Sequence, residues 1–165
     1  MIRGPMKTNR ISRLTLCLFL VVLLGGCSYM PFWGDEDRVL ATTIVASSKL
    51  NPNADGRPSP LVVNVYELKS VTFFETAEFF TLVDNPRNAL GDDLIKQREV
   101  AVKPGDAVDL TIKPHSDTNY VGVVASYQDI SKADWRKTVA VPPEGEARLV
   151  INLEARAVTL AIKRD

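Results

Sequence analysis

The sequence predicts a mainly β fold: a two-layer β-sandwich of about eight strands with a short helical insertion after the second strand. Three observations support this fold class. Short apolar segments recur from residue 39 onward, separated by proline, glycine, asparagine and aspartate. The clearest of them, residues 147–154, alternates apolar and polar side chains with a period of two. One segment, 70–90, instead has phenylalanines at helical spacing.

Residues 1–26 have the layout of a secretory signal peptide. A basic stretch without acidic residues precedes an apolar run at 14–24, which is too short to span a bilayer, since a helix needs about 20 residues for that. The run ends in Leu24-Gly25-Gly26-Cys27, which resembles the bacterial lipobox. We therefore expect cleavage before Cys27 and lipidation of its thiol. The alternative is an ordinary secreted protein with a cysteine there by chance.

Residues 27–38 are expected to form a lipidated N-terminus and tether, and residues 39–165 the sandwich domain. Ser28 follows the cysteine, whereas the familiar sorting rule retains lipoproteins with aspartate there in the inner membrane; Ser28 therefore indicates the outer membrane. The tether contains Tyr29, Phe32 and Trp33 before acidic residues 35–37. These aromatic side chains fit the level of the lipid headgroups, and packing on the domain or disorder remains open.

Charge and cysteine content exclude several function classes. Removal of the four basic residues of the signal leaves 16 of the 20 lysines and arginines against 20 acidic residues, so the mature chain is mildly acidic. That argues against nucleic acid as a partner. Cys17 leaves with the signal and Cys27 carries the lipid, so no thiol remains for a disulfide, a metal site or nucleophilic catalysis.

The expected strands share short length and flanking turn residues; they are residues 39–49, 60–69, 95–102, 107–112, 120–127, 135–141, 147–154 and 158–163. The short connection around Ala155 makes the last two an antiparallel hairpin. Between the second and third strands, Phe73, Phe74, Ala77 and Phe80 recur at helical spacing. We expect one or two short helices that end near residues 85–86 and seal the core, with Thr72 and Glu75 as a capping box.

The turn at 51–60 combines prolines that fix φ, a glycine that permits positive φ, and side chains that bond their own backbone. Its Asn-x-Asn-x-Asp-Gly spacing imitates the first half of a calcium loop, but Val62 occupies the position of the bidentate glutamate, so a rigid turn is the favoured interpretation. Such a stiff, polar loop also suits a protein partner, because little entropy is lost on binding.

No arrangement of residues predicts catalysis or a metal site. The single histidine, His115, is a sequence neighbour of Ser116 and Asp117, which precludes the geometry of a catalytic triad. Adjacent carboxylates at Asp92 and Asp93 diverge, so they do not form an acid–base pair. Trp135 is expected to be a core residue at a strand start, with an interface anchor beside Arg136 as the alternative.

Several motifs together resemble the TssJ (VasD/SciN) family of type VI secretion outer-membrane lipoproteins. They are the lipobox, the Gly56-Arg57-Pro58-Ser59-Pro60 block after Asn51 and Asn53, the Val63-x-Val65-Tyr66-x-Leu68-Lys69-Ser70 strand with Phe74, Phe79, Phe80 and Leu82, and Gly122-Val123-Val124-Ala125-x-Tyr127 with Trp135-Arg136. The resemblance covers nearly the whole mature chain.

This resemblance implies a transthyretin-like sandwich on the periplasmic face of the outer membrane, without enzymatic activity. It implies binding to the periplasmic C-terminal region of TssM, within a complex that also contains TssL. It implies no cofactor apart from the lipid on Cys27, no metal and no small-molecule substrate; a periplasmic ligand-binding lipoprotein is the alternative. The expected partner-binding residues are Asn51, Pro52, Asn53, Ala54, Asp55, Gly56, Arg57, Pro58 and Ser59.

Overall fold

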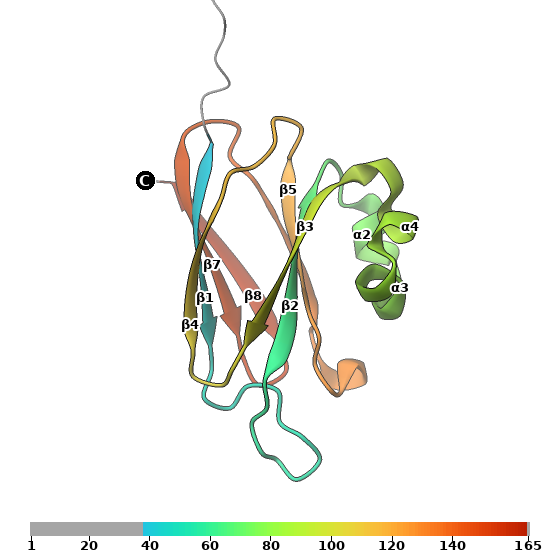
Figure 1. Ribbon diagram of the computed structural model, residues 1–165, viewed down its shortest axis with the longest axis vertical. Coiled ribbons are helices and arrows are strands. Elements are labelled where there is room, and N and C mark those ends of the chain that lie inside the picture. The colour runs from blue at the N-terminus through green and yellow to red at the C-terminus, as the bar shows by residue number, and fades with distance from the viewer. Residues whose placement is uncertain (1–37, 165) are drawn as a thin grey trace, which may run out of the picture. The chain divides into compact units, whose positions relative to one another are not determined.

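In the computed structural model of the chain, the described residues are 38–164. They form eight strands in two four-stranded sheets, with a layer of short helices on one flank (Figure 1). The first sheet has the order β4-β1-β7-β8 and the second has the order β3-β2-β5-β6. The predicted two-layer sandwich with a helical insertion after the second strand is therefore confirmed.

The strand bounds are β1 Val39–Ala46, β2 Leu61–Leu68, β3 Leu94–Val102, β4 Ala107–Ile112, β5 Tyr120–Ala125, β6 Arg136–Ala140, β7 Glu146–Leu153 and β8 Val158–Arg164. The expected first strand, 39–49, is too long, because the chain turns at Ser47, whose carbonyl accepts a hydrogen bond from Leu50 N–H at 3.0 Å. The fourth strand has the expected bounds, and the last two form the expected antiparallel hairpin.

One pairing in the first sheet is parallel. β1 lies between β4, to which it is antiparallel, and β7, to which it is parallel, with Val39 opposite Glu146 and Ala46 opposite Leu153. The first strand of the domain thus occupies an interior position of its sheet. β1 and β7 start at the same end of the sandwich. The loop after β1 therefore emerges at the other end, away from where the chain enters β1 and β7.

Two apolar clusters lie on either side of the second sheet. Alternate residues of β2 and β5, such as Val63 and Val123, face the first sheet and join the main core. The residues between them, such as Tyr66 and Val124, face the helices and form a second cluster. Because both faces are covered, these two strands are buried almost throughout, whereas β7 alternates buried and more accessible residues.

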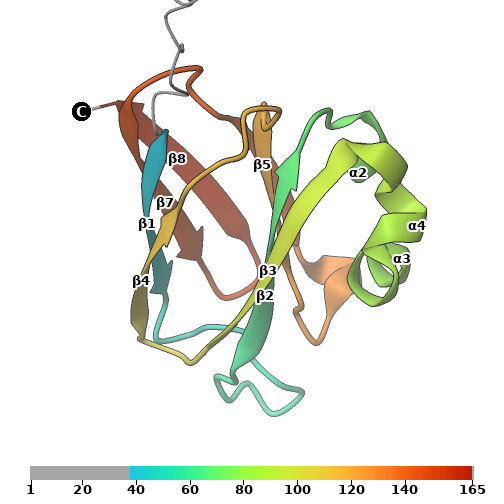
Figure 2. The ribbon, with the colours of Figure 1, turned by 45° about the horizontal axis from the view of Figure 1, so that its top comes forward.

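The helical layer covers the outer face of the second sheet (Figure 2). It consists of α2 Thr72–Thr76, α3 Phe79–Asp84, α4 Pro86–Leu90 and the 3₁₀ turn η1 Gly91–Asp93. The expectation of one or two helices ending near 85–86 is wrong, because Pro86 starts a third helix, where a missing N–H costs nothing. The prediction of a capping box is also wrong. Val71 is the N-cap of α2, and Thr72 N–H donates a hydrogen bond to Ser70 Oγ at 3.3 Å.

The phenylalanine stripe divides between core and surface. Phe74 is fully buried, and its ring centroid lies 5.4 Å from that of Tyr66, whose hydroxyl donates to Leu82 O at 2.9 Å. Phe73 and Phe80 are 58% and 64% exposed, contrary to the expectation that the stripe belongs to the core. Ala77 has extended backbone angles, so the helical period does not continue from α2 into α3.

Arg136 attaches the helical layer to the sheet. Its Nη1 donates to the carbonyls of Phe74 and Ala77, both at 2.8 Å, and its guanidinium lies 4.5 Å from the centre of the Trp135 ring. Burial lowers the pKa of Arg136, and the nearby Glu75 and Glu78 oppose that shift. A cation at carbonyls of the last turn of α2 is electrostatically favourable. Trp135 is half-buried and contacts both clusters, which places it nearer to the expected core role than to a free anchor.

The predicted signal peptide, Cys27 and most of the predicted tether lie outside the described residues. Arg38, the last tether residue, is described, and its guanidinium donates to Thr118 O at 2.9 Å, to Ser116 O at 3.0 Å and to His115 O. The chain is therefore bound to the β4–β5 loop one residue before β1 begins.

Candidate functional site

The loop between β1 and β2, residues 47–60, projects from one end of the sandwich, at the bottom of Figure 1. Ala54, Asp55, Gly56, Arg57 and Pro58 are exposed at its tip. Pro52, Asn53 and Ser59 are half-buried, and Asn51 is buried with 3% of its surface exposed. The structure therefore brings five of the nine predicted binding residues fully to the surface and places Asn51 inside.

Asn53 closes the tip of this loop. Its side-chain Oδ1 accepts hydrogen bonds from Asp55 N–H at 3.0 Å and Arg57 N–H at 2.9 Å. Its backbone N–H donates to Arg57 O and its carbonyl accepts from Gly56 N–H, each at 2.9 Å. Gly56 has φ 78°, a conformation that favours glycine. The side chain that a calcium ion would need is thus engaged in forming the turn.

The charged side chains at the tip, Asp55 and Arg57, are exposed to solvent. Within residues 38–164, Asp55 and Arg57 use no side-chain atom in a hydrogen bond or an ion pair. A fixed backbone carries one free carboxylate and one free guanidinium two residues apart. This arrangement can form charge-assisted hydrogen bonds with another protein at little cost in chain entropy.

Asn51 joins the loop to two others at the same end. Its Nδ2 donates to Pro60 O at 2.9 Å, and its Oδ1 accepts from Gln128 N–H at 2.9 Å. Its backbone N–H donates to Ala155 O at 3.1 Å, and its φ is 47°. Asn51 therefore positions the loop rather than presenting a surface for contact, a role that sequence reasoning did not assign to it.

Tyr127 completes this junction. Its hydroxyl lies 2.7 Å from Ala157 O and 3.1 Å from Glu154 O, so it fixes the β7–β8 turn to the end of β5. Burial raises the pKa of Tyr127, and the nearby carboxylates of Glu154 and Asp134 add to that shift. Sequence reasoning placed Tyr127 within a strand and missed this role; an aromatic residue directly before a polar turn is the signal available.

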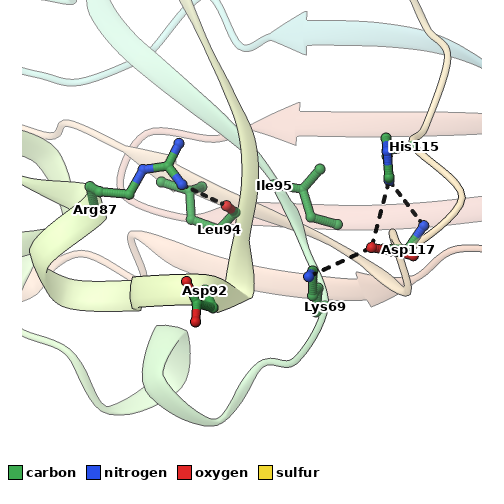
Figure 3. A pocket seen from close by; sticks show the side chains of 7 residues that line it. All are labelled: Lys69, Arg87, Asp92, Leu94, Ile95, His115 and Asp117. Carbon is green, nitrogen blue, oxygen red and sulfur yellow. Dashed lines mark hydrogen bonds and ion pairs between the residues drawn. The ribbon is translucent and has the colours of Figure 1, made fainter.

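A concave region, separate from the 47–60 loop, lies beside the β4–β5 loop (Figure 3). It is an open groove of about 310 Å³ in which Lys69 and Asp117 form an ion pair at 3.6 Å. His115 Nδ1 accepts a hydrogen bond from Asp117 N–H at 3.2 Å, and His115 N–H donates to the buried Glu67 at 3.1 Å. The backbone N–H of His115 and the hydroxyl of Thr118 thus cap the buried carboxylate of Glu67. An open groove with charged walls lacks the enclosed apolar lining of typical ligand pockets.

Asp92 and Asp93 lie in η1, with Asp92 exposed and Asp93 half-buried. In the part of the chain that the structure describes, no three His, Cys, Asp or Glu side chains are grouped so as to hold a metal ion.

None of the helices between residues 38 and 164 has the length and apolar character required to cross a membrane.

Two four-stranded sheets with a projecting loop at one end and a helical layer on one flank define a β-sandwich protein with a helical insertion. Residues 38–156 match the family model T6SS-SciN, described as type VI secretion lipoprotein, VasD, EvfM and TssJ. Since the match covers more than half of the chain, the chain belongs to this family of type VI secretion lipoproteins. No curated protein matches.

Several solved structures of type VI secretion proteins contain chains that are similar to this one. The type VI lipoprotein TssJ1 from Pseudomonas aeruginosa is 33% identical, with a TM-score of 0.75 over 78% of this chain and 98% of that chain. One chain of a structure described as the type VI membrane complex is 26% identical, with a TM-score of 0.66 over 74% and 97%. One chain of a structure described as the TssM C-terminal domain from EAEC is 26% identical, with a TM-score of 0.63 over 74% and 97%.

The protein is a TssJ-family type VI secretion lipoprotein. Members of this family are structural lipoproteins, so the prediction of a non-enzymatic function is confirmed.

Proposed function

We propose that the loop of residues 51–59 binds the periplasmic C-terminal region of TssM through its exposed tip, residues 54–58, and so ties the trans-envelope complex, which includes TssL, to the outer membrane. Membership of the TssJ family supports a partner within the secretion system. The structure described as the TssM C-terminal domain, which contains a chain similar to this one, supports TssM in particular.

The observation that carries this proposal is the closure of the loop by Asn53. Two N–H groups of the tip bond its side-chain oxygen, and two further backbone bonds close the same turn. Ordering one backbone residue costs about 1–2 kcal/mol, so a loop that is already ordered retains more of its contact energy for affinity. The free charges of Asp55 and Arg57 then supply specificity.

The proposal places the anchor at Cys27, on the periplasmic face of the outer membrane. Lipidation there would attach more than one acyl chain, because a single chain does not hold a protein stably in a membrane. The acyl chains would be the only non-protein group that the function requires. Ser28 supports the outer membrane as the destination. In this arrangement the sandwich transmits force between the lipid and the loop and needs no cofactor.

Replacement of residues 53–57 by a flexible Gly/Ser linker tests the loop assignment. Binding of the purified TssM C-terminal region, measured by biolayer interferometry, should weaken at least about tenfold, equivalent to roughly 1.4 kcal/mol. The fold should persist, because the replaced residues lie outside both apolar clusters.

Residues 143–145 provide the matched control. They form an exposed turn that leads into β7, at the end of the sandwich opposite to the loop. The same Gly/Ser replacement there should leave TssM affinity unchanged. Unchanged affinity in the 53–57 variant, with an unaltered melting temperature, would remove the loop from the interface.

A further inference from the structure

The helical layer exposes two large aromatic side chains. Among the described residues, the exposed large hydrophobic side chains are Phe73, Phe80 and Val45, at 58%, 64% and 40%. Two of the three therefore belong to one short insertion. That insertion covers a flank of the sandwich, whereas the 47–60 loop projects from its end (Figures 1 and 2). We call Phe73, Phe80, Glu78, Asp92 and Asp93 the helical flank.

The exposed rings are carried on a firmly attached layer. The Phe80 ring lies edge-on to Phe79, with centroids 5.2 Å apart, and Phe79 lies edge-on to Trp135 at 5.1 Å. Phe73 precedes the fully buried Phe74, and Arg136 bonds two carbonyls of that segment. Aromatic side chains presented by a rigid element lose little entropy on binding and are typical interface anchors.

Phe73 also forms one wall of a shallow groove of about 360 Å³. The other walls are the end of α4 and the 3₁₀ turn η1, including Leu90, Gly91, Asp92 and Asp93. An aromatic wall thus faces two adjacent carboxylates across an open surface. The arrangement can accept a side chain with an aliphatic stem and a cationic head, because the stem covers the ring while the head meets the carboxylates.

The charge of the insertion selects among possible occupants. Residues 70–93 contain five carboxylates, at positions 75, 78, 84, 92 and 93, against the single cation Arg87, which gives a net charge of −4. The acidic stretch 35–37 of the chain has the same sign of charge, which disfavours it as the occupant. A second copy docked through the same face would oppose like charges, and an anionic lipid surface is disfavoured for the same reason.

We infer that the helical flank binds a basic segment of a partner protein, with apolar side chains against the exposed rings of Phe73 and Phe80 and lysine or arginine against Asp92, Asp93 and Glu78. This surface is separate from residues 51–59. The sandwich therefore has two docking surfaces and can join two polypeptide segments within the membrane complex. The inference does not depend on the loop assignment.

The test uses the chain with Cys27→Ser, without lipid. Relatives were solved as chains that match 74–78% of this one over 97–98% of their own length, so this domain folds without a long N-terminal extension. The probe is a fluorescein-labelled 12-residue peptide of alternating lysine and leucine, and binding is followed by fluorescence anisotropy. Measurements at low and high salt report the charge contribution.

The double variant Phe73→Ser/Phe80→Ser should weaken binding at least about tenfold. Asp92→Asn/Asp93→Asn should weaken it several-fold, and a glutamate–leucine peptide should not bind. Val45→Ser, the matched exposed hydrophobic control on β1, and the 53–57 linker variant should bind normally. Circular dichroism melts verify that each variant is folded.

Three results would overturn the inference. The first is equal binding of the probe by the Phe73→Ser/Phe80→Ser variant. The second is phenylalanine-dependent co-sedimentation with neutral phosphatidylcholine vesicles, which would identify a lipid surface instead. The third is phenylalanine-dependent dimerisation in analytical ultracentrifugation, which would identify a second copy of the chain.

Discussion

At the scale of single residues, Asn51 connects the fold to its proposed function. Its side-chain amide bonds Pro60 O and Gln128 N–H, and its backbone N–H bonds Ala155 O, so it joins its own loop to two others. Its φ of 47° lies in the left-handed region, which asparagine tolerates better than most residues. Both the side chain and the backbone conformation therefore favour asparagine at this position.

Substitutions at Asn51 separate these two contributions. Asn51→Gly keeps the backbone angle accessible but leaves Gln128 N–H and Pro60 O without their partner, which should cost about 1–3 kcal/mol. Asn51→Ala loses the same bonds and adds strain at positive φ, so it should be less stable than Asn51→Gly by roughly 1 kcal/mol. Urea denaturation followed by tryptophan fluorescence measures both. Equal stability of the two variants would show that the backbone angle carries no cost.

At the scale of elements, the helical layer depends on close approach to β5. An added Cβ at Gly122 would lie 2.7 Å from Phe74 Cζ and 2.9 Å from Leu68 Cδ1. Both side chains are fully buried, so neither has free space into which to move. Glycine at this position allows the α2 aromatic ring to rest directly on the strand.

Gly122→Ala should therefore destabilise the domain by about 1–3 kcal/mol through overpacking. The loss should be concentrated in the layer, so amide hydrogen exchange in α2 and α3 should accelerate more than exchange in β1 and β7. Gly145→Ala separates overpacking from backbone strain, because Gly145 has open space around it but a φ of 78°. Uniform acceleration across all elements would contradict a local packing effect.

The elements differ in how far sequence predicts them. β7 alternates because one of its faces is accessible, and the expected bounds, 147–154, differ from the observed Glu146–Leu153 by one residue at each end. The helices are harder to predict, because the extended Ala77 and Glu78 interrupt a helical spacing that is continuous in the sequence. The 51–59 loop is recognisable from its prolines and glycine. The interior position of Asn51 is not, since its partner Gln128 lies 77 residues away.

At the scale of the whole molecule, the point where the chain enters the sandwich and the proposed partner surface lie at opposite ends. The chain enters β1 at Val39, and the loop follows the other end of that strand. Eight residues of strand span roughly 26 Å at about 3.3 Å each. Arg38 fixes the point of entry by bonding three carbonyls of the β4–β5 loop. Under the proposed function, load between this point of entry and the loop would act along β1 and be resisted by its two neighbouring strands.

Replacement of Cys27 by serine tests the anchor. The Cys27→Ser protein should appear in the soluble periplasmic fraction after osmotic shock and should still be folded, because serine lacks the thiol that would carry the acyl chains. Cys17→Ser, a change in the other cysteine of the chain, should leave the protein with the outer membrane. Retention of the Cys27→Ser protein in the outer membrane of cells without TssM would contradict the anchor.

The parallel pairing of β1 with β7 also has a consequence for biogenesis. Val39 meets Glu146 only after nearly the whole polypeptide has been delivered, so the first sheet cannot close while the chain is still being threaded through an export channel. Contacts so distant in sequence also make folding comparatively slow. This order of events suits a secreted precursor, since the module stays translocation-competent until its last strands arrive and gains mechanical strength only at its destination.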